Sequence, residues 1–146
     1  MKMVDFIVCD DIRHEVLNKV TLVGIYTDKI VLPPNTKYPA KLRLAFFSKF
    51  LHEKSDPRLD SFRVVFQNND KEIARVDGMV GGEINLESPF VVSFVISEFP
   101  VFAPGEIKAS FVFLNKGEAV NEIKPPSSIA VFEMEPKKNQ SGPVVN

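Results

Sequence analysis

The most chemically diverse run of the sequence is CDDIRHE, residues 9–15, which holds a thiol, three carboxylates, a guanidinium and an imidazole. Oxygen and nitrogen donors of these kinds can hold a metal ion or a small ligand. The candidate side chains for such a polar site are Asp10, Asp11, Arg13, His14 and Glu15. Neighbouring side chains on a strand point to opposite faces, so these groups converge only if the chain turns tightly. The simpler interpretation is a polar strand end at which Arg13 pairs with a nearby carboxylate.

Motifs for catalysis and cofactor binding are missing from the sequence. Cys9 and His14 could form a nucleophile and base, but Cys9 continues an apolar run, which is more typical of a buried core thiol. No second histidine follows His14 at the spacing of zinc proteases. Neither phosphate-binding glycine loops nor a G-x-S-x-G nucleophile turn occur. We therefore expect a protein that is not an enzyme, with no catalytic residue, no metal and no cofactor.

Composition and charge exclude several classes of partner. The 146 residues suit one domain, and 18 basic against 19 acidic side chains leave a net charge of −1. This balance offers neither the basic footprint of a nucleic-acid-binding protein nor attraction to an anionic membrane. The first residues lack a signal-peptide pattern, no apolar run is long enough to span a membrane, and a single cysteine allows no intrachain disulfide. We therefore expect a cytoplasmic protein that binds neither nucleic acid nor membrane.

Period-two alternation of apolar and polar residues dominates the chain and predicts half-buried β-strands. It predicts eight or nine strands, over residues 3–9, 19–26, 28–32, 41–50, 60–67, 71–77, 90–96, 106–114 and 128–135. Residues 10–18 come nearest to a helix, with Asp11 as the cap of a single turn. Short strands separated by turn signals, with 13 phenylalanines to fill a core, favour a single-domain antiparallel β-sandwich. The predicted domain is 1–135, and 136–146 form a flexible tail.

Residues 90–96 are apolar on both faces of the predicted strand, which departs from the alternation. The first interpretation is a central strand that the protein covers on both sides. The second is a contact between subunits through Phe90, Val92, Phe94 and Ile96, because an exposed apolar face marks an interaction site. We expect the protein to act by protein–protein contact, as a homodimer or with another protein. The alternative is a metal- or small-ligand-binding module that uses residues 10–15.

The opening of the chain resembles a family of small uncharacterised bacterial proteins known as a domain of unknown function. The resemblance is carried by a C-D-D-I-R-x-E segment and a T-L-x-G-I-Y strand, at Cys9, Asp10, Asp11, Ile12, Arg13, Glu15, Lys19, Leu22, Gly24 and Tyr26. Pro104-Gly105 begins a segment that resembles the family's closing hairpin, with Ile107 where the family has an aromatic residue. The resemblance implies one compact immunoglobulin-like sandwich and lends no activity, cofactor or catalytic residue.

Overall fold

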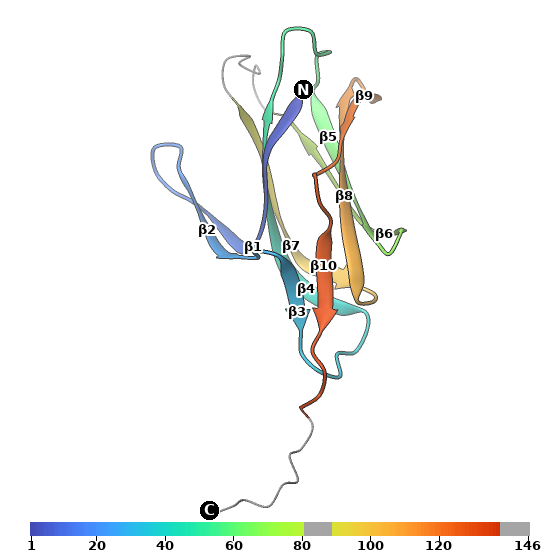
Figure 1. Cartoon of the computed structure of the whole chain (residues 1–146). Coiled ribbons are helices and arrows are strands. Elements are labelled where there is room, and N and C mark those ends of the chain that lie inside the picture. The colour runs from blue at the N-terminus through green and yellow to red at the C-terminus, as the bar shows by residue number, and fades with distance from the viewer. Residues whose placement is uncertain (81–88, 138–146) are drawn as a thin grey trace, which may run out of the picture.

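The computed structural model describes residues 1–80 and 89–137, and within these ranges the chain forms strands and no helix. Its strands build two facing sheets (Figure 1). In chain order they are β1 (Lys2–His14), β2 (Val20–Ile25), β3 (Lys29–Leu32), β4 (Ala40–Leu51), β5 (Ser61–Asn68), β6 (Lys71–Met79), β7 (Phe90–Val101), β8 (Gly105–Asn115), β9 (Glu118–Ile123) and β10 (Ile129–Glu133). The prediction of an all-β, sandwich-like domain is confirmed. Most of the predicted tail, residues 138–146, lies outside the described ranges.

The first sheet has the strand order β2-β1-β4-β7, and the second has the order β3-β10-β8-β5-β6 with β9 alongside β8. Two details of the prediction are wrong. The described residues hold ten strands, because β9 carries two glutamates and an asparagine that conceal its alternation. The β3–β10 pair is parallel, since these strands lie far apart in the sequence and no hairpin sets their direction.

Phenylalanine rings fill the space between the sheets. Six of them are wholly buried: Phe46, Phe50, Phe66, Phe99, Phe111 and Phe113. The rings interlock across the two layers, with centroids 4.7 Å apart for Phe46 and Phe66 and 5.0 Å apart for Phe50 and Phe113. Tilted and edge-to-face pairs of this kind add to the stabilisation that burial alone gives. The apolar alternation in residues 41–50, 60–67 and 106–114 therefore identifies most of the core.

Two asparagines at the β5–β6 turn hold the connection from β7 to β8. Asn68 is 4% exposed, and its Oδ1 accepts hydrogen bonds from the amides of Phe102 (2.9 Å) and Ala103 (3.0 Å). Its Nδ2 donates to the carbonyls of Ala103 (3.2 Å) and Glu106 (3.3 Å). Asn69 bonds the same connection through Pro104 O and Glu106 N. The segment thus forms the expected hairpin turn and also fixes a second corner of the sandwich.

No helix in the described part of the chain is long and apolar enough to cross a membrane.

Candidate functional site

A two-stranded hairpin leaves the body of the sandwich and carries most of the candidate polar site. β1 pairs with β4 from Lys2 to Cys9, and beyond Cys9 it pairs only with β2. We call residues 10–25 the arm, and Figure 1 shows it projecting from the sheets. The strand prediction for residues 3–9 ended too early, and residues 10–18, the segment nearest to a helical pattern, hold no helix. Adjacent charged residues hide the alternation there, while pairing with β2 keeps the chain extended.

The base of the arm is fixed by Cys9 and Asp11. Cys9 is wholly buried, its Sγ lies 3.4 Å from the carbonyl of Asp11, and burial raises the pKa of the thiol. Oδ1 of Asp11 accepts hydrogen bonds from the guanidinium of Arg43 and the amide of Ile12, each at 3.0 Å. Both bonds lower the pKa of Asp11. A strand-end ion pair exists as expected, but its cation is Arg43 on β4 and not Arg13.

Asp10 lies on the inner side of a bend at Gly24. The hydroxyl of Tyr26 donates to Asp10 Oδ1 at 2.9 Å. Burial, followed by the contact with this carboxylate, raises the pKa of Tyr26 to about 12. Gly24 has φ +68°, and a Cβ there would overlap the Asp10 carboxylate. Glycine is therefore required at this point, where the arm bends away from the body.

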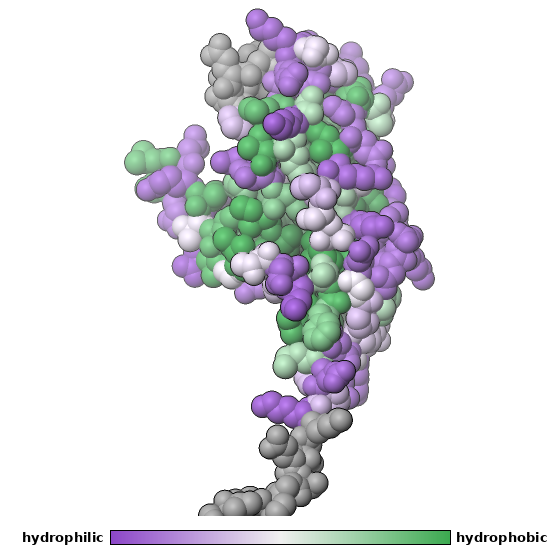
Figure 2. All heavy atoms as spheres, in the orientation of Figure 1, coloured by the Kyte–Doolittle hydropathy of each residue, from purple (hydrophilic) through white to green (hydrophobic). Residues whose placement is uncertain are grey.

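The end of the arm exposes apolar side chains. The amide of Glu15 donates to the carbonyl of Lys19 at 2.8 Å, which closes the turn. Within it, Val16 is 76% and Leu17 87% exposed, and apolar atoms are visible at the end of the arm in Figure 2. Leu17 and Asn18 both have left-handed backbone conformations, with φ 61° and 58°. For a leucine this conformation costs about 1–2 kcal/mol. The turn thus carries a strained, solvent-facing leucine that contributes nothing to the core.

The five predicted polar residues are spread along the arm and do not converge. Asp10 bonds Tyr26, Asp11 bonds Arg43, and the carboxylate of Glu15 accepts a 3.2 Å hydrogen bond from Thr21. Arg13 and His14 are exposed. Among residues 1–80 and 89–137, no three His, Cys, Asp or Glu side chains lie close enough together to hold a metal ion. The metal- or small-ligand alternative stays a prediction.

A groove of about 860 Å³ runs between the arm and the outer face of the first sheet. His14, Glu15 and Val20 line it from the arm, while Phe47 and Val91 line it from β4 and β7. Phe47 is 6% exposed although it belongs to an outer face, and the ammonium of its neighbour Lys49 lies 6.0 Å from the ring centroid. The sheet side of the groove is therefore mixed, with Phe47 and Val91 next to Lys49 and Ser93.

The residues predicted as a subunit contact lie on the inner face of β7. Val92 is buried, and the rings of Phe90 and Phe94 each lie 5.4 Å from a core phenylalanine. Ile96 also packs against the core. Among the described strands β7 lies at the edge of its sheet, so the first interpretation, a central strand, is wrong, while the subunit contact stays a prediction. The apolar side chains that β7 exposes are those of the opposite face, Val91 at 46% and Val95 at 37%.

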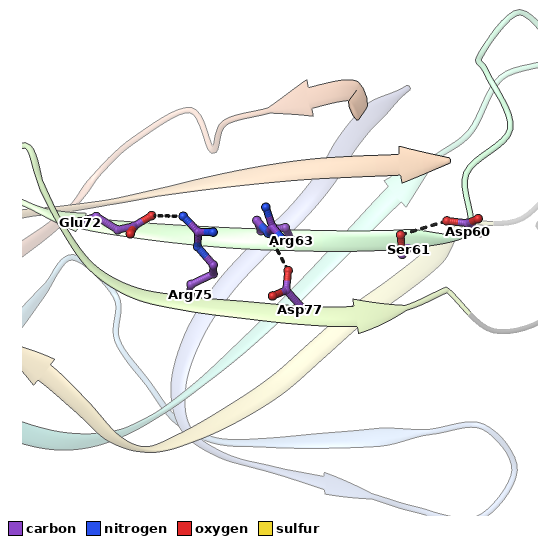
Figure 3. A network of polar contacts seen from close by, with 6 residues as sticks. All are labelled: Asp60, Ser61, Arg63, Glu72, Arg75 and Asp77. Atoms are coloured by element: carbon purple, nitrogen blue, oxygen red, sulfur yellow. Dashed lines mark hydrogen bonds and ion pairs between the residues drawn. The ribbon is translucent and has the colours of Figure 1, made fainter. Parts of the chain in front are cut away.

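The outer face of the second sheet has a different character. Figure 3 shows two ion pairs there: Arg63 of β5 bonds Asp77 of β6 at 2.7 Å, and Arg75 bonds Glu72 within β6 at 2.8 Å. These charged side chains are about half exposed and make the β5–β6 part of that surface polar. On the same sheet Val31 of β3 and its register neighbour Phe132 of β10 are 47% and 49% exposed. Exposed apolar side chains therefore occur on both sheets, and those of the first sheet lie on the arm and on β7.

Comparison with known proteins finds no family model that matches this chain and no similar protein of curated function. The resemblance of residues 9–26 to a family of unknown function therefore stays a prediction.

Proposed function

We propose that this chain is a non-catalytic module that binds protein through the arm and the groove beneath it. The observation that carries the proposal is the turn at the end of the arm, where Val16 and Leu17 stand almost fully exposed on a projecting hairpin. Exposed apolar side chains of this kind mark interaction sites. Strained residues persist where the surrounding structure or a function maintains them, and no core contact accounts for Leu17.

The form of the groove supports a protein segment as its occupant. Its lining combines the apolar side chains of Phe47 and Val91 with the charged groups of Glu15, Lys19 and Lys49. Protein interfaces commonly combine an apolar centre with a polar rim.

Two further parts of the proposal concern the fold type and the compartment. The two-sheet architecture supports an immunoglobulin-like sandwich, and a single cysteine that is buried supports a cytoplasmic setting.

Photo-crosslinking in the cells that make the protein tests the proposed function. A photoreactive amino acid replaces Leu17 in one variant and Met79 in another, because Met79 is similarly exposed at 77% but lies at the end of β6. We expect covalent protein adducts from position 17 and few from position 79. Equal adduct yields at the two positions, or none at either, would contradict protein binding by the arm.

A further inference from the structure

β2 is an edge strand that lacks the usual protection against pairing with other chains. Among the described strands it pairs with β1 alone, and its residues, VTLVGI, include neither a charge nor a proline. The other edge strands of the described chain are protected: β3 has four residues and a lysine, β6 has four charges, β7 has Glu98 and Pro100, and β9 has two glutamates. Charges, prolines and short length are how edges avoid pairing. β2 is thus the described edge best suited to accept another strand.

A further strand would also stabilise the arm. A two-stranded hairpin by itself is at best marginally stable in water, and beyond Cys9 the arm has only its own two strands. Its apolar side chains remain open, with Val20 37% and Ile25 51% exposed in addition to the turn. An added strand along β2 would cover part of this surface and complete the hydrogen bonds of the edge.

We propose that the strand added to β2 is the β2 strand of a second copy, paired antiparallel about a twofold axis. This inference rests on the proposed function and names its partner. An edge that pairs antiparallel with itself gives a closed dimer, because the same surface serves both subunits. The net charge of −1 leaves little repulsion between the copies.

The charges at the two ends of β2 are complementary in this arrangement. Lys19 precedes the strand at the turn, whereas Asp28 follows it at the base of the arm, and both are exposed. Lys29, next to Asp28, has its ammonium over the Phe132 ring at 5.4 Å from the centroid. Antiparallel pairing brings the start of one strand next to the end of the other. Each lysine therefore approaches the aspartate of the second copy, while parallel pairing would place like charges together.

A hollow at the base of the arm offers a seat for the exposed leucine of the second copy. It measures about 300 Å³ and is lined in part by Ile7, Ile25 and Tyr26. Antiparallel pairing carries the turn of each arm to the base of the other, which brings Leu17 close to this hollow. The dimer thus gives a place to the side chain that is 87% exposed in a single chain.

Light scattering with size-exclusion chromatography tests the dimer on the full chain. We expect the wild type to have twice the mass of 16.4 kDa and to dissociate on dilution. Leu17→Asp and Ile25→Lys should be monomers with unchanged circular dichroism, while the matched control Met79→Asp stays dimeric. A wild type that is monomeric at millimolar concentration, or a dimer that both arm variants retain, overturns the inference.

Spin labels at the turn test the direction of pairing. Asn18→Cys provides an exposed thiol, because the natural Cys9 is buried. With about 3.3 Å per residue, antiparallel β2 strands place the two labels about 30 Å apart. A distance below about 15 Å would contradict the arrangement. The dimer and the proposed function can fail separately. If position 17 forms adducts with a different protein, the proposed function stands and only the second copy as partner is overturned.

Discussion

Replacement of Asn68 by alanine should destabilise the sandwich more than any single exposed substitution. The side chain is 4% exposed and makes four hydrogen bonds to the backbone of residues 102–106. These bonds join the β5–β6 turn to the β7–β8 connection, which lies more than thirty residues further along the chain. The substitution removes all four side-chain hydrogen bonds. It leaves the backbone pairing between the strands unchanged.

The size of the effect follows from the number of bonds. Each hydrogen bond contributes about 0.5–1.5 kcal/mol net to the free energy of unfolding, so the loss of four bonds costs at most about 2–6 kcal/mol. Water reaches part of this corner, because Phe102 is 48% exposed, and it will replace some of the lost bonds. We therefore expect the free energy of unfolding to fall by about 3 kcal/mol. In a chain of this length that loss lowers the melting temperature by about 6–12 °C.

Urea unfolding followed by circular dichroism measures this loss. Gln67→Ala serves as the matched control, since Gln67 neighbours Asn68 on β5 but is half-exposed. It should change the free energy of unfolding by less than about 0.5 kcal/mol. A loss below about 1 kcal/mol for Asn68→Ala, or equal losses for the two variants, would refute the reasoning that these bonds hold the corner.

Further predictions concern the arm and the ionisable groups. Gly24→Ala should lower the free energy of unfolding by about 2 kcal/mol in urea unfolding, since φ is +68° and a Cβ meets a carboxylate. Absorbance titration should show Tyr26 and Tyr38 ionising near pH 12, so that stability falls between pH 10 and 12. Below about pH 4, protonation of Asp11 breaks its bond to Arg43, and Arg43→Gln should reduce this loss of thermal stability. Zn²⁺, Mg²⁺ or Ca²⁺ should shift the melting temperature by less than about 1 °C, because the described chain lacks three converging ligands.

Much of the fold could be predicted from alternation, because the sandwich buries one face of most strands. β5 and β8 show this directly, with Val64, Phe66, Phe111 and Phe113 all buried at period two. The pattern failed where a strand has no buried face. The outer half of β1 extends into the arm, and its charged residues conceal the strand. The alternation missed β9 for the same reason, since its side chains are half-exposed or exposed.

The polar residues singled out in the sequence lie on the arm, but they do not converge there. The residue types from Cys9 to Glu15 are those of metal or small-molecule ligands, whereas the structure shows their side chains in separate contacts along the arm. The exposure of Val16 and Leu17 could not be predicted from the sequence, because it depends on how far the hairpin projects from the sheets. One signal was present in the sequence: VTLVGI carries neither a charge nor a proline, the features that protect an edge strand.

Hydrogen exchange of the β2 amides at two protein concentrations tests the central claim most directly, namely that the arm works by contact through this edge. Amides that gain partners only in a dimer exchange more slowly as the dimer fills. The account predicts that protection of residues 20–25 rises with concentration while protection of β5 and β8 stays constant. Exchange of β2 that is equally fast at micromolar and millimolar concentration would contradict it.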